Sequence, residues 1–184
     1  KKTYDFKGFP ILLTLARLEK RKGHSHILAA IAKLKIEYPN ILYVIAGSGE
    51  ELSNLKKIVH KLNIENNVLF VGTINNNEKN FLFKKTDLLI MPTTDETNNR
   101  SIEGFGIAYI EAAFYGVPSI ASNIGGTPEA VIHEETGLIL PKIDDVYSVL
   151  QNLISDKTKI KKLGQNAKIR AESNYQWKNV IKNY

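Results

Sequence analysis

Residues 11–37, ILLTLARLEKRKGHSHILAAIAKLKIE, combine the two kinds of pattern on which the expected architecture rests. The first part, 11–16, is a short apolar run, which predicts a buried strand. The second part, 23–37, has apolar residues at helical intervals and predicts an amphipathic helix. These residues are Ile27, Leu28, Ile31 and Leu34. A strand followed by a helix is the first half of a crossover between parallel strands.

The same alternation continues along the chain. Apolar runs at 41–46, 68–71, 88–91 and 117–121 predict strands, and segments at 50–62, 78–85 and 103–115 predict the intervening helices. Strands that are apolar along their whole length and are joined by helices are typical of a parallel sheet covered on both faces. We therefore predict an α/β fold with a doubly wound, Rossmann-like parallel sheet. An extended piece at 137–140 and helices beginning near Asp144 and Asp156 are expected to close the chain.

Composition limits the classes of function. The 184 residues suit a single domain, 1–184, and the absence of cysteine excludes disulfides, thiolate zinc sites and a cysteine nucleophile. A reducing cytoplasm is the expected setting for a chain without cysteine. No apolar run reaches the length of a membrane span, and no apolar stretch like the core of a signal peptide follows Lys1 and Lys2. The start at Lys1 resembles a cut inside a longer protein. The net charge of +6 attracts anions but does not choose among phosphates, nucleic acid and acidic lipid.

Loops at the carboxyl ends of the strands are the expected place for a ligand in a doubly wound sheet. The first such loop holds Arg17 and Lys22 just before a helix and suits an anion, although a solvated basic turn explains it equally well. The second holds Gly47 and Gly49, which would let the backbone approach a ligand closely. A simple tight turn is the favoured explanation for that pair, because neither a full dinucleotide-binding motif nor a P-loop is present.

The segment EGFGIAYIE, residues 103–111, carries the strongest chemical signal. Its glycines, Gly104 and Gly106, precede an apolar helix whose free amides could bind a diphosphate. On one continuous helix Glu103 and Glu111 would lie about 12 Å apart along the axis. Glu103 has an alternative explanation as a favourable first-turn acid. Glu111 interrupts an apolar helix and needs a partner, because an unpaired buried carboxylate is costly.

Other kinds of site are not expected. His24, His26, His60 and His133 show no metal-ligand spacing, and no Gly-x-Ser-x-Gly nucleophile motif occurs. Thr127 followed by Pro128 predicts another helix start, with Thr127 as its cap. We expect no metal and no cofactor. We also expect no nucleic-acid partner, since aromatic and basic residues are not interleaved as in RNA-binding modules.

Taken in order, these motifs resemble the carboxyl-terminal domain of family-four glycosyltransferases of the GT-B fold, over nearly the whole chain. The residues that carry the resemblance are Ala16-Arg17-Leu18 with Lys22-Gly23, Ala46 to Glu50, Val71-Gly72, Met91-Pro92, Glu103 to Glu111, Gly116-Val117-Pro118 and Gly125 to Glu129. The two glutamates separated by seven residues are the most specific element. The chain departs from the family pattern in having Ala16 where glycine is usual, and its loop between Pro92 and Glu103 is longer than in many members.

The resemblance implies transfer of a sugar from a UDP- or GDP-linked donor to an acceptor hydroxyl, with retention of configuration and without a metal. It implies that Arg17 and Lys22 hold the diphosphate and that Glu111 binds the ribose hydroxyls. The backbone of Gly72, Thr73 and Ile74 would meet the base. Glu103, Gly104 and the amides of Phe105, Gly106 and Ile107 would face the donor sugar and phosphates.

The resemblance also implies a second, amino-terminal domain that binds a saccharide or lipid-linked acceptor and without which this chain does not turn over. Residues 175–184 would pack toward that domain, so the aromatic side chains of Tyr175, Trp177 and Tyr184 are expected to be exposed here. The whole protein would be cytoplasmic, with peripheral contact to the inner face of the membrane. Two alternatives stay open: a non-catalytic nucleotide- or phosphate-binding module, and a nucleotide-sugar epimerase of the same fold.

Overall fold

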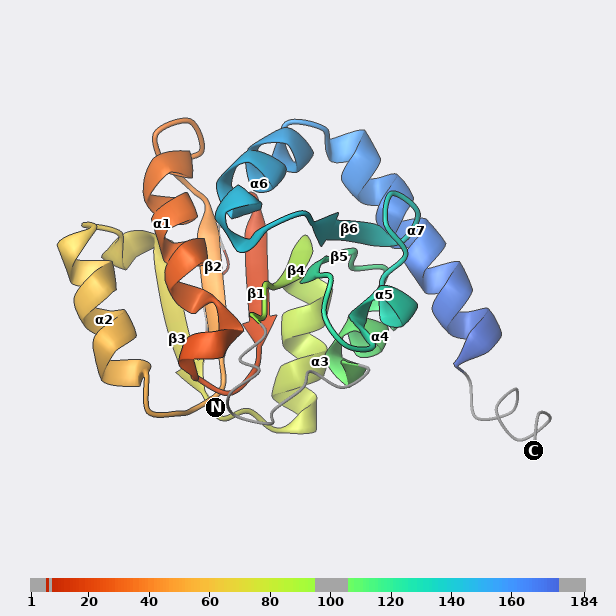
Figure 1. Cartoon of the computed structure of the whole chain (residues 1–184), viewed down its shortest axis with the longest axis horizontal. Coiled ribbons are helices and arrows are strands. Elements are labelled where there is room, and N and C mark those ends of the chain that lie inside the picture. Colours follow the sequence, from red (N-terminus) through yellow and green to blue (C-terminus); the bar gives the residue numbers. More distant parts are fainter. Residues whose placement is uncertain (1–5, 7, 95–105, 176–184) are drawn as a thin grey trace.

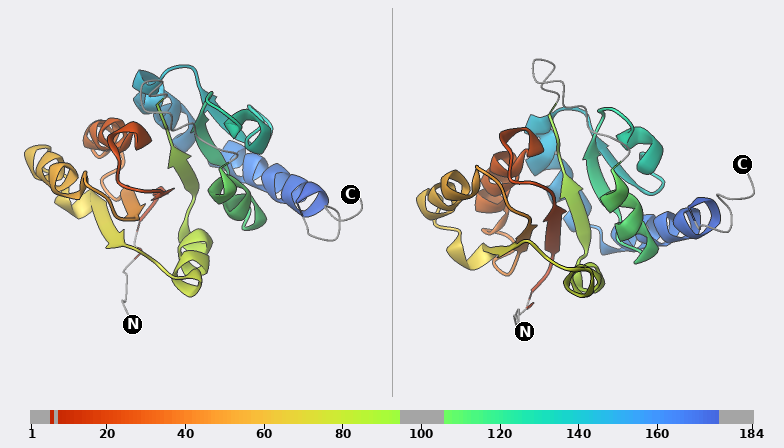
Figure 2. Two further views of the ribbon diagram at one scale, coloured as in Figure 1. Left: turned by 60° about the horizontal axis from the view of Figure 1, so that its bottom comes forward. Right: turned by 90° about the horizontal axis from the view of Figure 1, so that it is seen from below.

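A computed structural model describes residues 6, 8–94 and 106–175, which form a sheet with helices on both faces (Figures 1 and 2). The strands are β1 (Ile11–Leu15), β2 (Leu42–Ala46), β3 (Val68–Gly72), β4 (Leu88–Met91), β5 (Ser119–Ser122) and β6 (Gly137–Leu140). Their spatial order is β3-β2-β1-β4-β5-β6, and every neighbouring pair is parallel. This is the strand order of a doubly wound dinucleotide-binding sheet, as predicted.

Helices connect the strands. They are α1 (His24–Leu34), α2 (Leu52–Lys61), α3 (Asn76–Lys85), α4 (Ile107–Phe114), α5 (Thr127–Ala130), α6 (Val146–Ile154) and α7 (Lys157–Asn174), with short 3-10 turns η1 (Lys20–Lys22), η2 (Glu65–Asn67) and η4 (Ile143–Asp145). No helix in the described part of the chain has the length and apolar character needed to cross a membrane.

The sheet separates two apolar cores because successive side chains of a strand point to opposite faces. In β1, Leu12 belongs to the core formed with α1, α2 and α6, whereas Ile11 and Leu13 belong to the core formed with α3 and α4. β2 and β4 alternate in the same way. Burial on both faces is the reason why these strands are apolar along their whole length.

Three predicted helix starts need correction. Helix α4 begins at Ile107 with Gly106 as its N-cap, not at Glu103, so the 12 Å separation expected for a continuous helix does not follow. Thr127 does not cap α5, because its hydroxyl lies within hydrogen-bond distance of the carbonyl oxygens of Ser122 and Ile124. Helix α6 begins at Val146, without a side-chain cap from Asp144 or Asp145.

The helix start at Asp156 is confirmed, since its carboxylate accepts a hydrogen bond from the amide of Lys159 at 2.8 Å.

Candidate functional site

The loops that follow β1, β2, β3 and β4 meet at the carboxyl edge of the sheet. Strand β1 pairs with both β2 and β4, so the direction in which the chain winds reverses at β1. In doubly wound sheets a ligand binds outside the carboxyl ends of the strands at such a reversal. The fold therefore brings the predicted donor-binding loops to one edge of the molecule.

The loop after β1 presents a guanidinium to solvent. The side chain of Arg17 is 71% exposed, and its Nη1 lies 2.7 Å from Oε1 of Glu19. The other oxygen of Glu19 accepts a hydrogen bond from Nε of Arg21 at 2.9 Å. Glu19 thus holds two arginines in place, a role that the sequence analysis missed. Lys22 lies in η1 and is buried. Of the two predicted phosphate ligands, Arg17 is therefore exposed to solvent and Lys22 is not.

Backbone hydrogen bonds connect the first three loops. The amide of Leu18 donates to the carbonyl of Ser48 at 2.9 Å, and the amide of Gly47 donates to the carbonyl of Gly72 at 2.9 Å. A Cβ at Gly47 would lie 1.9 Å from the carbonyl oxygen of Ala16, so this position requires glycine. Gly47 and its loop therefore have a structural role in the close approach of two loops, whether or not they also contact a ligand.

The loop after β3 has open space next to Gly72. Gly72 has φ +73°, a conformation that favours glycine, yet a Cβ there would have no atom within 4 Å. Thr73 is exposed, and its hydroxyl donates to Oγ of Ser48 at 3.3 Å. Ile74 is half-buried against the core beneath α3 and α4. Glycine is therefore favoured at position 72 by its backbone conformation and not by close packing, and the predicted contact of this loop with a base stays a prediction.

Tyr109 fixes the start of α4 against β4. Its hydroxyl donates to the carbonyl of Met91 at 3.0 Å, and its side chain is buried. Gly106, with φ +73°, lies so close that a Cβ would be 2.5 Å from the Tyr109 ring. Ile107 follows as the first residue of α4 and is 72% exposed. The apolar side chain of Ile107 is therefore largely open to solvent.

Glu111, the fifth residue of α4, has the partner that the sequence analysis required. Its Oε1 forms an ion pair with Nζ of Lys79 on α3, and the Glu111 side chain is 32% exposed. It is therefore partly buried and just over one turn into its helix, not two. Glu103, Gly104 and Phe105 lie outside the described residues, so their predicted roles stay predictions.

A buried hydrogen-bond chain supports the first loop from below. Thr14 donates its single hydroxyl proton to the carbonyl of Ile90, so Tyr43 must donate to Thr14 across their 2.9 Å contact. Tyr43 then accepts from Nδ1 of His24 at 3.0 Å. Burial lowers the pKa of His24 to about 4, so the ring is neutral at pH 7. This series of hydrogen bonds connects α1 to β1, β2 and β4 below the loop that holds Arg17, and no sequence motif indicated it.

His24 also lines a cavity of about 210 Å³ between the amino ends of α1 and α2. In the neutral ring whose Nδ1 donates, Nε2 is an acceptor, and it lies 3.5 Å from the carbonyl oxygen of Arg17. Glu19 and Glu51 also line the cavity, which places it directly behind the first loop.

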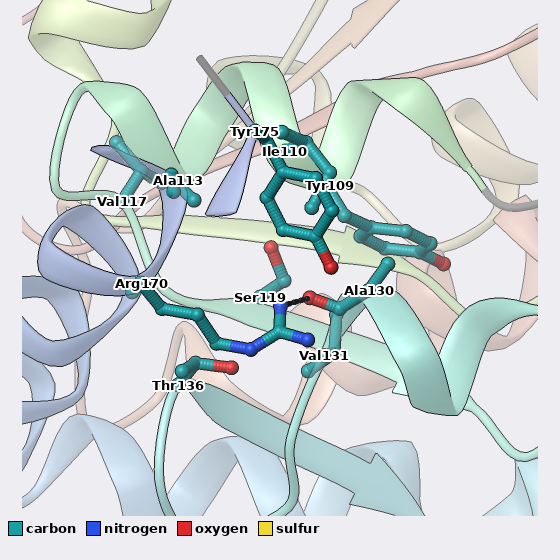
Figure 3. A pocket seen from close by; sticks show the side chains of 12 residues that line it. Tyr109, Ile110, Ala113, Val117, Ser119, Ala130, Val131, Thr136, Arg170 and Tyr175 are labelled. Carbon is teal, nitrogen blue, oxygen red and sulfur yellow. Dashed lines mark hydrogen bonds between the residues drawn. The ribbon is translucent and has the colours of Figure 1, made fainter. Parts of the chain in front are cut away.

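The loop after β5 is held through α5 by the last described helix. Arg170 of α7 donates to the carbonyl of Glu129 at 2.7 Å, where α5 ends. It also donates to the carbonyl of Ala130 at 3.5 Å (Figure 3). Tyr175 donates to the same Glu129 carbonyl at 3.3 Å, and its ring lies 5.2 Å from the Arg170 guanidinium carbon. Tyr175 is half-buried, so the expected exposure of this aromatic is wrong.

The edge therefore combines an exposed guanidinium, open space beside Gly72 and a carboxylate anchored by a lysine. Such a set can bind an anionic group at one end and hydroxyl groups at the other. Among residues 6, 8–94 and 106–175, no three His, Asp or Glu side chains are close enough together to hold a metal ion.

The sequence model of the family described as Glycosyl transferases group 1 matches residues 1–170. A GDP-mannose-dependent alpha-(1-6)-phosphatidylinositol monomannoside mannosyltransferase from Mycobacterium tuberculosis is 29% identical over 179 residues, which are 96% of this chain and 46% of the relative. An uncharacterized glycosyltransferase from Methanocaldococcus jannaschii is 30% identical over 94% of this chain and 43% of its own length. This chain spans less than half the length of these relatives.

Solved structures agree on the fold. HepE from Anabaena, crystallised with UDP and glucose, has a TM-score of 0.82 and 22% identity, and covers 94% of this chain and 46% of its own. The carboxyl-terminal domain of the group 1 glycosyl transferase LpcC from Francisella tularensis has a TM-score of 0.80 and 23% identity, with 92% of this chain and 88% of that chain covered.

Proposed function

Since this chain belongs to the family of glycosyl transferases group 1, we propose that it forms the donor-binding part of a sugar-transferring enzyme. The donor is a UDP- or GDP-linked sugar, the acceptor group is a hydroxyl, and the anomeric configuration is retained. The observation that carries the proposal is the placement of Arg17, the Gly72 loop and Glu111 on different elements around the reversal point of the sheet. These groups suit the diphosphate, the base and the ribose of one extended ligand.

The proposed chemistry is the stabilisation of a leaving nucleoside diphosphate. Negative charge grows on the diphosphate as the glycosidic bond to the sugar breaks, and cations fixed before the reaction stabilise that charge without reorganising. Arg17 and Lys22 supply the cations, so the reaction proceeds without a divalent metal ion. Glu103, with the amides of Phe105, Gly106 and Ile107, binds the donor sugar and phosphates.

We further propose that the acceptor is a saccharide or a lipid-linked sugar bound by a second domain facing this edge. The mycobacterial relative is named for a phosphatidylinositol monomannoside, which supports a lipid-linked acceptor. We propose that the enzyme acts in the cytoplasm, at the inner face of a membrane. Turnover is expected only when this second domain is present.

Calorimetric titration with UDP and GDP, in magnesium and in EDTA, tests the donor site. We expect one of the two nucleotides to bind equally well in both solutions. Arg17→Ala should weaken that binding about tenfold, because a charge-assisted hydrogen bond to phosphate is lost. Lys57→Ala, which removes an exposed cation from α2, serves as the control. If neither nucleotide binds at millimolar concentration, the proposal fails, and strict dependence on magnesium would contradict its metal-free mechanism.

A further inference from the structure

The Lys79–Glu111 ion pair joins two helices on the same face of the sheet. Lys79 lies in the first turns of α3 and Glu111 in the second turn of α4, and 32 positions separate them in the sequence. Their side chains are 23% and 32% exposed. In a partly buried pair the attraction between the charges is largely offset by the cost of removing both from water, so its net contribution to folding stability is small. The main consequence of the contact is that it determines where the Glu111 carboxylate lies.

The position of Lys79 is itself fixed by the way α3 begins. Asn75 and Glu78 form a reciprocal capping box, with Oδ1 of Asn75 accepting from the Glu78 amide at 3.0 Å and Oε2 of Glu78 accepting from the Asn75 amide at 2.9 Å. The amide of Lys79 then donates to the carbonyl of Asn75 at 2.9 Å. The helix start, and Lys79 with it, is therefore tied to the loop that follows Gly72.

Within the described part of the chain, one of the two oxygens of Glu111 has a partner. Oε1 contacts Lys79, while Oε2 has no hydrogen bond to any residue in the described part of the chain. A carboxylate held by one oxygen keeps the other available to hydroxyl donors in a defined direction. Without Lys79 the side chain would have to be ordered at the moment of binding, which costs affinity.

We propose that Lys79 is a positioning residue for the ribose site: it holds Glu111 so that the free oxygen accepts hydrogen bonds from the ribose hydroxyls. This inference rests on the proposed function, because it assumes that a nucleotide occupies this edge. Its consequence is that Lys79 sets how strongly the chain discriminates a ribonucleotide from its 2′,3′-dideoxy analogue.

The test compares Kd values for UDP and GDP with those for 2′,3′-dideoxy-UDP and 2′,3′-dideoxy-GDP. Lys79→Met should weaken binding of the preferred ribonucleotide about fivefold, the factor that corresponds to ordering one side chain, and binding of its dideoxy analogue less than about twofold. Lys79→Arg should restore the discrimination, since it keeps the cation. Lys84→Met, an exposed lysine on the same helix, is the matched control and should change neither Kd.

Glu111→Gln completes a double-mutant cycle. It should abolish the discrimination, and Lys79→Met should have no further effect on ribonucleotide binding in that background. Equal losses for ribo- and dideoxynucleotides in Lys79→Met would overturn the inference, because Lys79 would then contact the base or the phosphates directly. If the unaltered chain binds no nucleotide, the proposed function fails and this inference fails with it.

Discussion

At the scale of single residues, His24 shows how burial controls a charge beneath the site. Its ring is 2% exposed, and desolvation lowers its pKa from 6.5 to about 4. The neighbouring cation of Lys22 acts in the same direction, whereas the carboxylate of Glu51 and the Arg17 carbonyl act against it. A neutral His24 donates to Tyr43 and completes the chain of hydrogen bonds to Ile90.

This shift predicts how stability depends on pH. The unfolded chain protonates His24 near pH 6.5 and the folded chain only near pH 4, so protons favour unfolding between these values. Stability is therefore fully present above pH 6.5 and falls toward pH 4, with a loss of about 2 kcal/mol from this residue between pH 7 and 5. Urea unfolding at both pH values should show this loss of stability reduced in His24→Gln. If the unaltered chain and His24→Gln lost the same amount of stability between pH 7 and 5, His24 would not be the cause of the loss.

At the scale of elements, the start of α4 depends on a glycine for two separate reasons. Gly106 and Gly72 share φ +73°, but a Cβ at Gly106 meets the Tyr109 ring whereas one at Gly72 meets open space. Gly72→Ala should therefore cost about 1–2 kcal/mol for the left-handed backbone alone. Gly106→Ala should cost at least about 1 kcal/mol more, because the ring must move as well. Chemical denaturation of the two variants measures the difference, and equal costs would mean that Tyr109 adapts freely.

The start of α3 rests on its capping box. Asn75→Ala removes the acceptor for the Glu78 amide and should cost about 1 kcal/mol. Asn77→Ala, two residues further along and exposed, leaves the cap intact and serves as the control. Thermal unfolding of both variants gives the comparison. A cost at Asn77 as large as that at Asn75 would show that the cap is not the cause.

At the scale of the whole molecule, α7 packs across α4 through small residues. Ala113 of α4 lies against Ala167 and Ala171 of α7, and a Cβ at Gly164 would lie 2.1 Å from the carbonyl oxygen of Gly116. Alanine in the middle of a helix normally stabilises it by about 1 kcal/mol relative to glycine. At position 164 the added Cβ would meet a backbone carbonyl, which cannot rotate away as a side chain can.

Gly164→Ala should therefore destabilise the protein by at least about 1 kcal/mol, despite the gain in helix propensity. Unfolding free energy measured in urea tests this result, with the exposed Gln165→Ala as a control expected to be nearly neutral. A more stable Gly164→Ala protein would show that α7 moves away from Gly116 at no cost.

Strand positions were predictable because residues such as Leu12 and Leu13, adjacent in sequence, are both buried, one on each face of the sheet. The start of α4 was harder to predict. The apolar pattern extends the helix back to Glu103, but α4 begins at Ile107 because Gly106 has a left-handed backbone, φ +73°, which a right-handed helix does not contain. For the site, the pattern indicated Arg17 and Glu111, yet their partners Glu19 and Lys79 were not identified.

The sequence by itself determined the fold class, because periodicity and the alternation of strands and helices are local properties of the chain, and it predicted the edge at which a ligand would bind. It also determined that Glu111 needs a partner, since a carboxylate inside an apolar helix is costly. Only the tertiary structure decided that the partner is Lys79, that His24 is neutral and that Gly164 requires glycine. Each of these depends on atoms from segments far apart in the chain, whose distances no local pattern encodes.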